Sequence, residues 1–252
     1  MDGIMNAQVL RNGFIALAAM AGAASAGITG PTALWIEATN ANGTGMLAID
    51  LTDGFFQPDG TFIWFNFVPQ NIIDTNNNQV IGQLRQGSLS ASNTSPLGLS
   101  FVVQAGAVDT VFTFTTATVQ IPGGYLNPDA RASAGLTLTD SNGNGATLTG
   151  LQTGGNYHTA FYNNASSEFS NLVQGPLVVV NPNGSTNANE DFPGPVGYAT
   201  IPGLVNDISA QFSFRLTAND QASGTSVFVV VPTPASIALL GISGLALTTR
   251  RR

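Results

Sequence analysis

Hydrophobic and polar residues alternate along much of this chain, and the alternation predicts β-strands. The clearest run extends from Ile208 to Thr217, where apolar residues occupy the even positions and polar residues the odd ones. A period of two gives one buried and one wet face, as in an antiparallel sheet. Shorter or noisier runs predict further strands at Leu34–Ala38, Met46–Leu51, Thr61–Val68, Ser100–Gln104, Val111–Ile121, Leu136–Thr139, Thr147–Leu151, Tyr157–Tyr162, Leu177–Val180 and Val227–Val231.

Turn-forming residues separate these runs, since Gly and Asn tolerate positive φ and Pro presets φ at a corner. Within Val111–Ile121 the apolar parity switches, which predicts a bulge or a crossing between two sheets. The proline-containing segment from Asn181 to Asn206 is predicted as an extended loop. No stretch between the two ends of the chain keeps a 3.6-residue period. We therefore expect an all-β fold, an antiparallel β-sandwich of jelly-roll type.

The first 26 residues have the pattern of a helical signal peptide. Arg11 precedes the apolar run from Phe14 to Ala21, and the small-residue triplet Ala24-Ser25-Ala26 follows. Cleavage after Ala26 would leave Gly27 as the first residue of the mature protein. The alternative of a buried core helix does not account for the cleavage triplet.

The last 21 residues combine a proline motif, an apolar run and a basic end. Pro232-Thr233-Pro234 follows Val231, mostly apolar residues occupy 235–249, and Arg250, Arg251 and Arg252 complete the segment. A helix of about 15 residues spans about 22 Å, which is short for a hydrocarbon core of about 30 Å. The three arginines should stay cytoplasmic, which places the body outside. The expected domains are 1–26 signal peptide, 27–231 β-sandwich and 232–252 membrane-sorting tail.

From Val231 to Arg252 the tail resembles the PEP-CTERM sorting signal, which has these three parts in this order. The resemblance implies a bacterial envelope protein that contacts the inner membrane transiently through its C-terminal helix. An exosortase-like enzyme would cleave near the proline motif and release or re-anchor the protein. Thr233 stands where the family has glutamate. A plain tail anchor remains the alternative.

Charge and cysteine content narrow the range of functions. Between residues 27 and 249 there are three arginines, no lysine and thirteen carboxylates, which gives a net charge of −10. Such a body repels phosphate backbones, so we expect no nucleic-acid partner. Because the chain has no cysteine, disulfides, thiolate metal sites and a lipidated cysteine are excluded.

The candidates for catalysis or metal binding are few. His158 is the only histidine, and no nucleophile motif such as G-x-S-x-G accompanies it. A glycosidase would need two carboxylates at a set separation, and Glu37, Asp50, Glu168, Glu190 and Asp191 are available. Asp140, Asn142 and Asn144 resemble the opening of a calcium loop, but Leu151 occupies the position of the closing glutamate. The chain is therefore expected to have no catalytic residues and no cofactor, with an Asn-Gly turn favoured at 140–145.

Three functional hypotheses follow, in order of preference. The first is an exported, non-catalytic structural or surface protein, sorted to the cell envelope or an extracellular polysaccharide matrix. The second is a carbohydrate-binding β-sandwich with polysaccharide as its partner, which binds with or without the assistance of calcium; the third is a hydrolase. A row of solvent-facing aromatics on one sheet would favour the second. The aromatic residues to inspect are Trp35, Trp64, Tyr125, Tyr157, Tyr162 and Tyr198, of which Trp64 is expected in the core because both faces of its strand are apolar.

Overall fold

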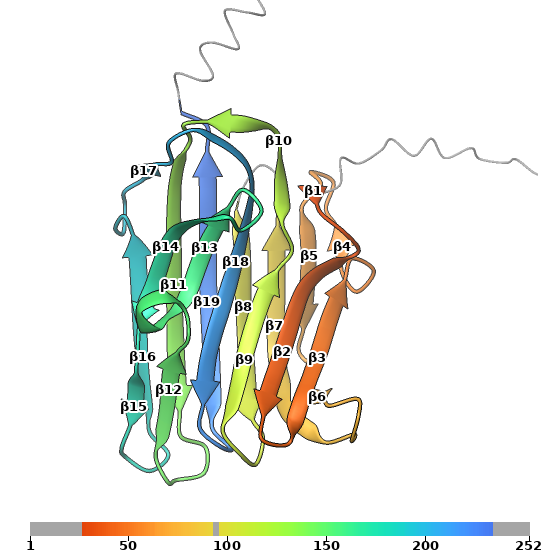
Figure 1. The fold of residues 1–252 in the computed structure, drawn as a ribbon, viewed down its shortest axis with the longest axis vertical. Coiled ribbons are helices and arrows are strands. Elements are labelled where there is room, and N and C mark those ends of the chain that lie inside the picture. The colour runs from red at the N-terminus through yellow and green to blue at the C-terminus, as the bar shows by residue number, and fades with distance from the viewer. Residues whose placement is uncertain (1–26, 93–95, 234–252) are drawn as a thin grey trace, which may run out of the picture.

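The structure, a computed structural model, describes residues 27–92 and 96–233, which form two antiparallel β-sheets packed face to face (Figure 1). This confirms the all-β sandwich. The only helical element in these ranges is a three-residue 3₁₀ turn, η1 (Thr153–Gly155). Within the same ranges no helix is long and apolar enough to cross a membrane. The predicted residues Ala24, Ala26, Pro234 and Arg250–Arg252 lie outside the described residues.

The first sheet, sheet A, is organised around the long strand β18 (Leu204–Leu216). One edge of β18 pairs with β9 and β10, and the other edge pairs with β12 and β13. The remaining strands extend the sheet on both sides or pair with β10. Besides β18, sheet A contains β1 (Gly27–Ile28), β2 (Thr32–Asn40), β3 (Gly43–Asp50), β9 (Thr110–Thr116), β10 (Val119–Leu126), β12 (Ala146–Gly150), β13 (Asn156–Tyr162), β14 (Ser167–Gln174) and β15 (Leu177–Val179).

The second sheet, sheet B, has the strand order β16-β11-β19-β8-β7-β5-β4. Strand β17 also pairs with β11, and β6 also pairs with β7. The bounds are β4 (Phe55–Phe56), β5 (Phe62–Asn66), β6 (Gln70–Ile73), β7 (Val80–Ala91), β8 (Leu97–Ala105), β11 (Asp129–Thr139), β16 (Ser185–Phe192), β17 (Ala199–Thr200) and β19 (Gln221–Val231).

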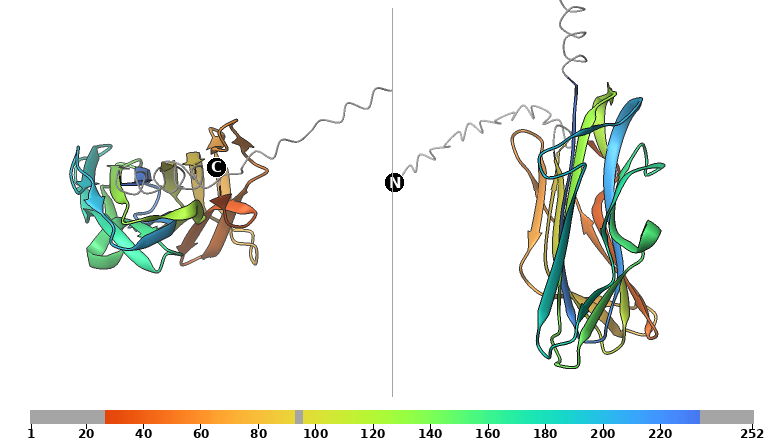
Figure 2. Two further views of the ribbon diagram at one scale, coloured as in Figure 1. Left: turned by 90° about the horizontal axis from the view of Figure 1, so that it is seen from above. Right: turned by 90° about the vertical axis from the view of Figure 1, so that its left-hand side faces the viewer.

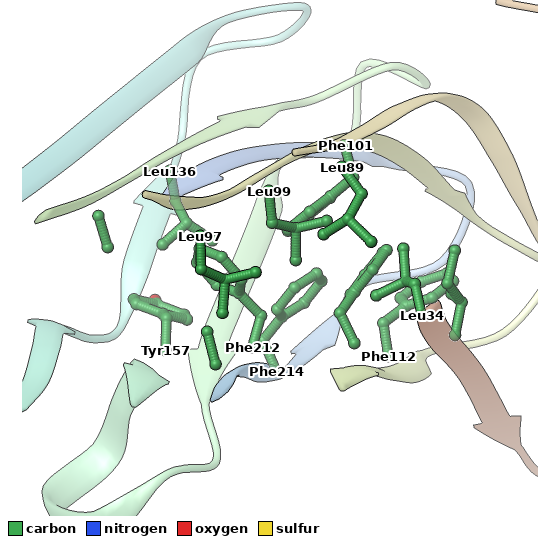
Figure 3. Packing of buried hydrophobic residues seen from close by; sticks show 14 of the residues in the cluster. Leu34, Leu89, Leu97, Leu99, Phe101, Phe112, Leu136, Tyr157, Phe212 and Phe214 are labelled. Atoms are coloured by element: carbon green, nitrogen blue, oxygen red, sulfur yellow. The ribbon is translucent and has the colours of Figure 1, made fainter. Parts of the chain in front are cut away.

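The core between the sheets is built around stacked phenylalanine rings (Figure 3). Phe101 of β8 stacks on Phe114 of β9 with ring centroids 3.9 Å apart, and it meets Phe212 of β18 edge-on at 5.1 Å. All three side chains are buried. Burying a side chain of this size contributes about 1.5–3 kcal/mol, so this cluster is a large part of what holds the two sheets together.

Buried glycines make room for these rings. Phe101 lies directly opposite Gly87 of β7 and Gly224 of β19, and a Cβ added at Gly224 would collide with the Phe101 ring. A Cβ at Gly87 would lie 2.7 Å from the ring of Trp64. Trp64 is 4% exposed, which agrees with the core position predicted from the apolar residues on both faces of its strand.

The parity switch within 111–121 reflects a bulge, as predicted, and not a crossing between sheets. Strands β9 and β10 both lie in sheet A along the same edge of β18, and the four steps from Thr115 to Val119 face only three steps from Gln211 to Ile208.

The prediction of an extended loop at 181–206 is wrong. This segment contains β16 and β17. Strand β16 has only Ala188 and Phe192 as apolar residues, which is too few for the alternation to predict it, and its backbone pairing with β11 at the margin of the sheet sets its conformation.

Strands β7 and β14 were not predicted from the alternation. In β7 the register shifts between Leu84 and Gln86, so the residues before and after that point change parity. In β14 a similar shift follows its pairing with Ala160. A bulge adds one residue and reverses the alternation, which hides a strand from a period-two pattern.

Candidate functional site: a trough across the outer face of sheet B

A row of directly paired residues crosses six strands on the face of sheet B that points away from sheet A. Neighbouring strands lie 4.7–4.9 Å apart, so the row is about 24 Å long. In order, the residues are Asn189 of β16, Gly135 of β11, Thr225 of β19, Ser100 of β8, Ser88 of β7 and Phe65 of β5. A parallel row beside it contains Asp191, Ser133, Val227, Gly98, Ser90 and Ile63.

Small side chains keep the floor of this surface low. We call the surface formed by the two rows the trough. It consists of three open depressions of about 150, 210 and 380 Å³ that share Thr225. A Cβ added at Gly98 would meet nothing closer than 3.9 Å, and one at Gly135 nothing closer than 3.6 Å. A methyl group would therefore fit at either glycine with only ordinary contacts, and its absence keeps the floor low.

One wall of the trough is a ridge of three exposed phenylalanines, Phe55, Phe65 and Phe67. Their exposed fractions are 49%, 53% and 70%. The rings contact one another, with centroids 6.2 Å apart for Phe55 and Phe65 and 5.5 Å apart for Phe65 and Phe67. Figure 2 (right) shows the orange β4–β5 margin farther from sheet A than the blue β19, so the ridge stands above the floor.

The sequence did not single out this ridge. Both faces of the run Phe62–Phe67 are apolar, which is typical of a buried strand. The structure places β5 near the margin of sheet B, where its inner face is covered and its outer face is open. The only signal that could have indicated this is the continuation of the apolar run into Val68-Pro69, because proline favours the margin or end of a strand.

The opposite wall is polar. Asp191 of β16 forms an ion pair with Arg131 of β11 at 3.2 Å. Glu190, the next residue, points away from the trough to the inner face, where its side chain accepts a hydrogen bond from the Val173 amide at 2.7 Å. The trough thus combines an apolar ridge with hydroxyl, amide and carboxylate groups, which suits an extended ligand that has an apolar face and many hydroxyls.

His158 lies in the core and not at the trough. Its side chain is fully buried, and its ring centroid is 4.7 Å from that of Phe212. Neither ring nitrogen has a hydrogen-bond partner within residues 27–92 and 96–233. Burial lowers the pKa of His158 to about 3, so the imidazole is neutral at ordinary pH.

Asp140 anchors a turn through its carboxylate. One oxygen accepts the amides of Asn142 and Gly143, and the other accepts those of Gly145 and Asn183. Burial acts to raise the pKa of Asp140, but these backbone hydrogen bonds outweigh it and hold the pKa below the ordinary value.

The other two predicted calcium ligands differ in their contacts. The Asn142 side chain accepts the Asn144 amide within the turn and donates to the carbonyl of Ala218, which lies between β18 and β19. The Asn144 side chain forms no hydrogen bond with any residue in the described ranges. The described part of the chain contains no cluster of three or more His, Cys, Asp or Glu side chains that could hold a metal ion.

The predicted glycosidase carboxylates do not come together as one set. Glu37, Asp50 and Glu168 belong to sheet A, on β2, β3 and β14. Glu190 and Asp191 both border the trough, but as consecutive residues of β16 they point to opposite faces.

The predicted aromatic candidates are likewise scattered. Tyr157 is buried, whereas Trp35, Tyr125 and Tyr162 are half-buried on strands of sheet A, and Tyr198 is 51% exposed beside β17. None of these six candidates other than the core residue Trp64 lines the trough.

Comparison with known proteins gives little further information. No protein-family model matches the chain, and no curated protein matches it. Among solved structures, a family 11 carbohydrate-binding module from Clostridium thermocellum, in complex with a β-1,3-1,4-mixed-linked tetrasaccharide, is similar over 68% of this chain and 89% of that chain. The two chains are 9% identical with a TM-score of 0.20, and a similarity this low supports no inference about the present chain.

Proposed function

We propose that this chain is an exported, non-catalytic surface protein of a bacterial envelope, and that its sandwich binds polysaccharide through the trough of sheet B. The observation that carries the binding role is the pairing of the phenylalanine ridge with a floor of small hydroxyl residues. Aromatic rings stack on the apolar faces of sugars, and hydroxyls and amides hydrogen-bond to sugar hydroxyls.

The preferred ligand is an uncharged polysaccharide. The mature body carries a net charge of −10, and the one arginine beside the trough, Arg131, is paired with Asp191. A uronic-acid or phosphate-bearing polymer would be repelled by this field.

Two glycine substitutions test the binding role. In Gly98→Val and Gly135→Val the added Cβ meets only ordinary contacts, and valine suits a strand, so the fold should persist while the trough is filled. We expect at least a 10-fold loss of affinity for neutral oligosaccharides identified on a glycan array with the full chain. Thr113→Val, on the outer face of sheet A, is the matched control and should bind as the wild type does.

The array should be run with and without EDTA, which decides whether calcium assists binding. If no sugar is retained at millimolar concentration, the proposed polysaccharide binding is wrong, and only the role as a structural surface protein remains. If the control loses affinity as strongly as the two glycine variants, the trough is not the binding surface.

Export and sorting rest on the two ends of the sequence and on where the body joins them. Gly27 and Val231 lie at the same end of the sandwich (Figure 1), which we call the tail-side end. With the tail in a membrane, the sandwich would stand on this end and leave the faces of both sheets accessible. An exosortase-like enzyme acting at Val231-Pro232-Thr233-Pro234 would then release or re-anchor it.

Fractionation of cells that express the full chain or a chain lacking residues 232–252 tests the sorting role. We expect the full chain in the membrane or on the surface and the shortened chain in the soluble exported fraction. Cytoplasmic retention of both forms would contradict export. Intact mass spectrometry of the protein from its native host would locate both cleavage points.

A further inference from the structure

The tail-side end of the sandwich carries exposed apolar side chains that neither the trough nor the core accounts for. Val196, Tyr198 and Leu204 are 89%, 51% and 48% exposed, and Leu126, the cross-strand partner of Leu204, is 57% exposed. We call these four residues the apolar rim. They come from β10, from β18 and from the segment between β16 and β17.

The rim lies next to the point where the tail leaves the body. Asp129 of β11 pairs with Val231 on one side and with Thr200 on the other. The Ile201 amide donates to the Pro128 carbonyl at 2.8 Å, which joins the segment that carries Tyr198 to the segment that follows Leu126. Figure 1 shows β10, β17 and the end of β19 together at this end.

The length of the tail brings this end close to the lipid. The described residues end at Thr233, and the apolar run of the sequence begins at Ala235. Two extended residues reach about 7 Å at most. A 15-residue helix is also about 8 Å shorter than a hydrocarbon core. Because the linker is short and the helix does not fill the hydrocarbon core, the tail-side end of the body is held close to the membrane interface.

We propose that the apolar rim rests in the headgroup region of the membrane that holds the tail. This inference depends on the tail-anchoring part of the proposed function. Tyrosine is enriched at membrane interfaces, and leucine and valine gain from leaving water there. Partial entry of the rim compensates for the short helix without requiring the bilayer to thin as far.

The contact is apolar and does not depend on anionic lipid. The rim contains no basic residue. Two carboxylates of this end form hydrogen bonds within the protein: Asp129 accepts the Thr200 hydroxyl at 2.7 Å, and the buried Asp207 accepts the Asn164 amide at 2.6 Å. A vesicle of zwitterionic phosphatidylcholine is therefore a sufficient probe.

The absence of cysteine allows a direct test with single-cysteine labels. Val196→Cys in the full chain places a polarity-sensitive fluorophore on the rim, and Tyr198→Cys gives a second position. Val180→Cys is the matched control, because Val180 is also an exposed valine, 80% accessible, but lies at the opposite end beside β15. Each labelled chain is reconstituted in phosphatidylcholine vesicles with and without a lipid that carries a shallow spin-label quencher.

We expect the rim labels to shift to shorter wavelength and to be quenched at least 3-fold more than the Val180 label. Equal quenching of the two ends would overturn the inference. A wavelength shift without quenching by lipid would mean that protein, such as a second copy, covers the rim, and would overturn it as well.

Carbonate extraction of the same vesicles separates the two proposals. If the chain is retained and the rim is not quenched, only the rim inference fails. If carbonate removes the chain, tail anchoring fails and the rim inference fails with it.

Discussion

The inner and outer faces of sheet B use glycine in opposite ways. On the inner face, Gly224 lies opposite Phe101, and the space of its missing side chain is filled by the aromatic ring. On the outer face of the same strand pair, Gly98 lies opposite Val227, and the space above it is open. One position permits core packing and the other creates a surface depression. The face on which a strand glycine lies therefore decides what its substitution does.

The largest effect is expected at Gly224. Gly224→Ala forces a Cβ into the Phe101 ring, which is also stacked on Phe114 and cannot move without disturbing the core. Overpacking of this kind costs about 3 kcal/mol. Urea denaturation of the full chain in mild detergent measures the change, with Gly135→Ala on the outer face as the control. If both variants had the same stability, the contrast between the two faces would be wrong.

The next largest effect should come from acidification, through His158 on the inner face of sheet A. Burial holds its pKa at about 3 in the folded protein, whereas an unfolded histidine titrates near 6.5. The unfolded chain thus binds a proton first as the pH falls. His158 leaves stability intact above about pH 6.5 and reduces it progressively from there toward pH 3.

At pH 5 this loss should be about 2 kcal/mol relative to pH 7.5. His158→Leu should remove the loss, because leucine carries no titrating group into the core. Asp140, whose pKa is held below its ordinary value, acts only at lower pH. Denaturation curves of both proteins at the two pH values provide the test, and a pH dependence unchanged by the substitution would show that His158 is not its source.

A smaller effect is expected for the buried hydroxyl of Tyr157. It donates to the Leu148 carbonyl at 2.6 Å and accepts the Leu177 amide at 2.8 Å, which ties β13 to β12 and β15. Tyr157→Phe leaves both backbone groups without this partner and should cost about 1–2 kcal/mol. Thermal unfolding followed by circular dichroism measures it, and an unchanged midpoint would indicate that the bridge contributes nothing net.

The smallest effect on stability should be that of Gly98→Ala on the outer face. The added methyl meets only ordinary contacts, so the free energy of unfolding should change by no more than about 0.5 kcal/mol. The comparison is sharpest if Gly98→Val has similarly small effects on stability and yet abolishes glycan retention. A large destabilisation by Gly98→Ala would mean that the outer face is packed as tightly as the core.

The alternation of residues was enough to predict the main strands and the sandwich. The strand prediction for Ile208–Thr217 is correct because β18 is a central strand with one buried face, so every second residue must be apolar. The same rule fails for β16, whose conformation comes from backbone pairing with β11 at the margin of the sheet. It fails also for β7, where a register shift reverses the parity within the strand.

Almost nothing in the sequence pattern indicated the candidate site. Phe65 and Trp64 are neighbours in one apolar run, yet Trp64 is 4% exposed and Phe65 is 53% exposed. Their opposite directions follow from the strand, but which direction is inward depends on the sheet packed against it. The floor residues come from strands scattered between residues 88 and 225, and only pairing brings them into one row.

By itself, the sequence determined the strand-rich character of the body, its acidic surface and its lack of disulfides, since these depend on composition and on local alternation. The tertiary structure alone decided that His158 is buried, that Asp140 binds turn amides, and that small residues from five strands form a trough beside a phenylalanine ridge. The physical reason is that burial and cross-strand contact depend on residues far apart in the chain, which no local pattern records.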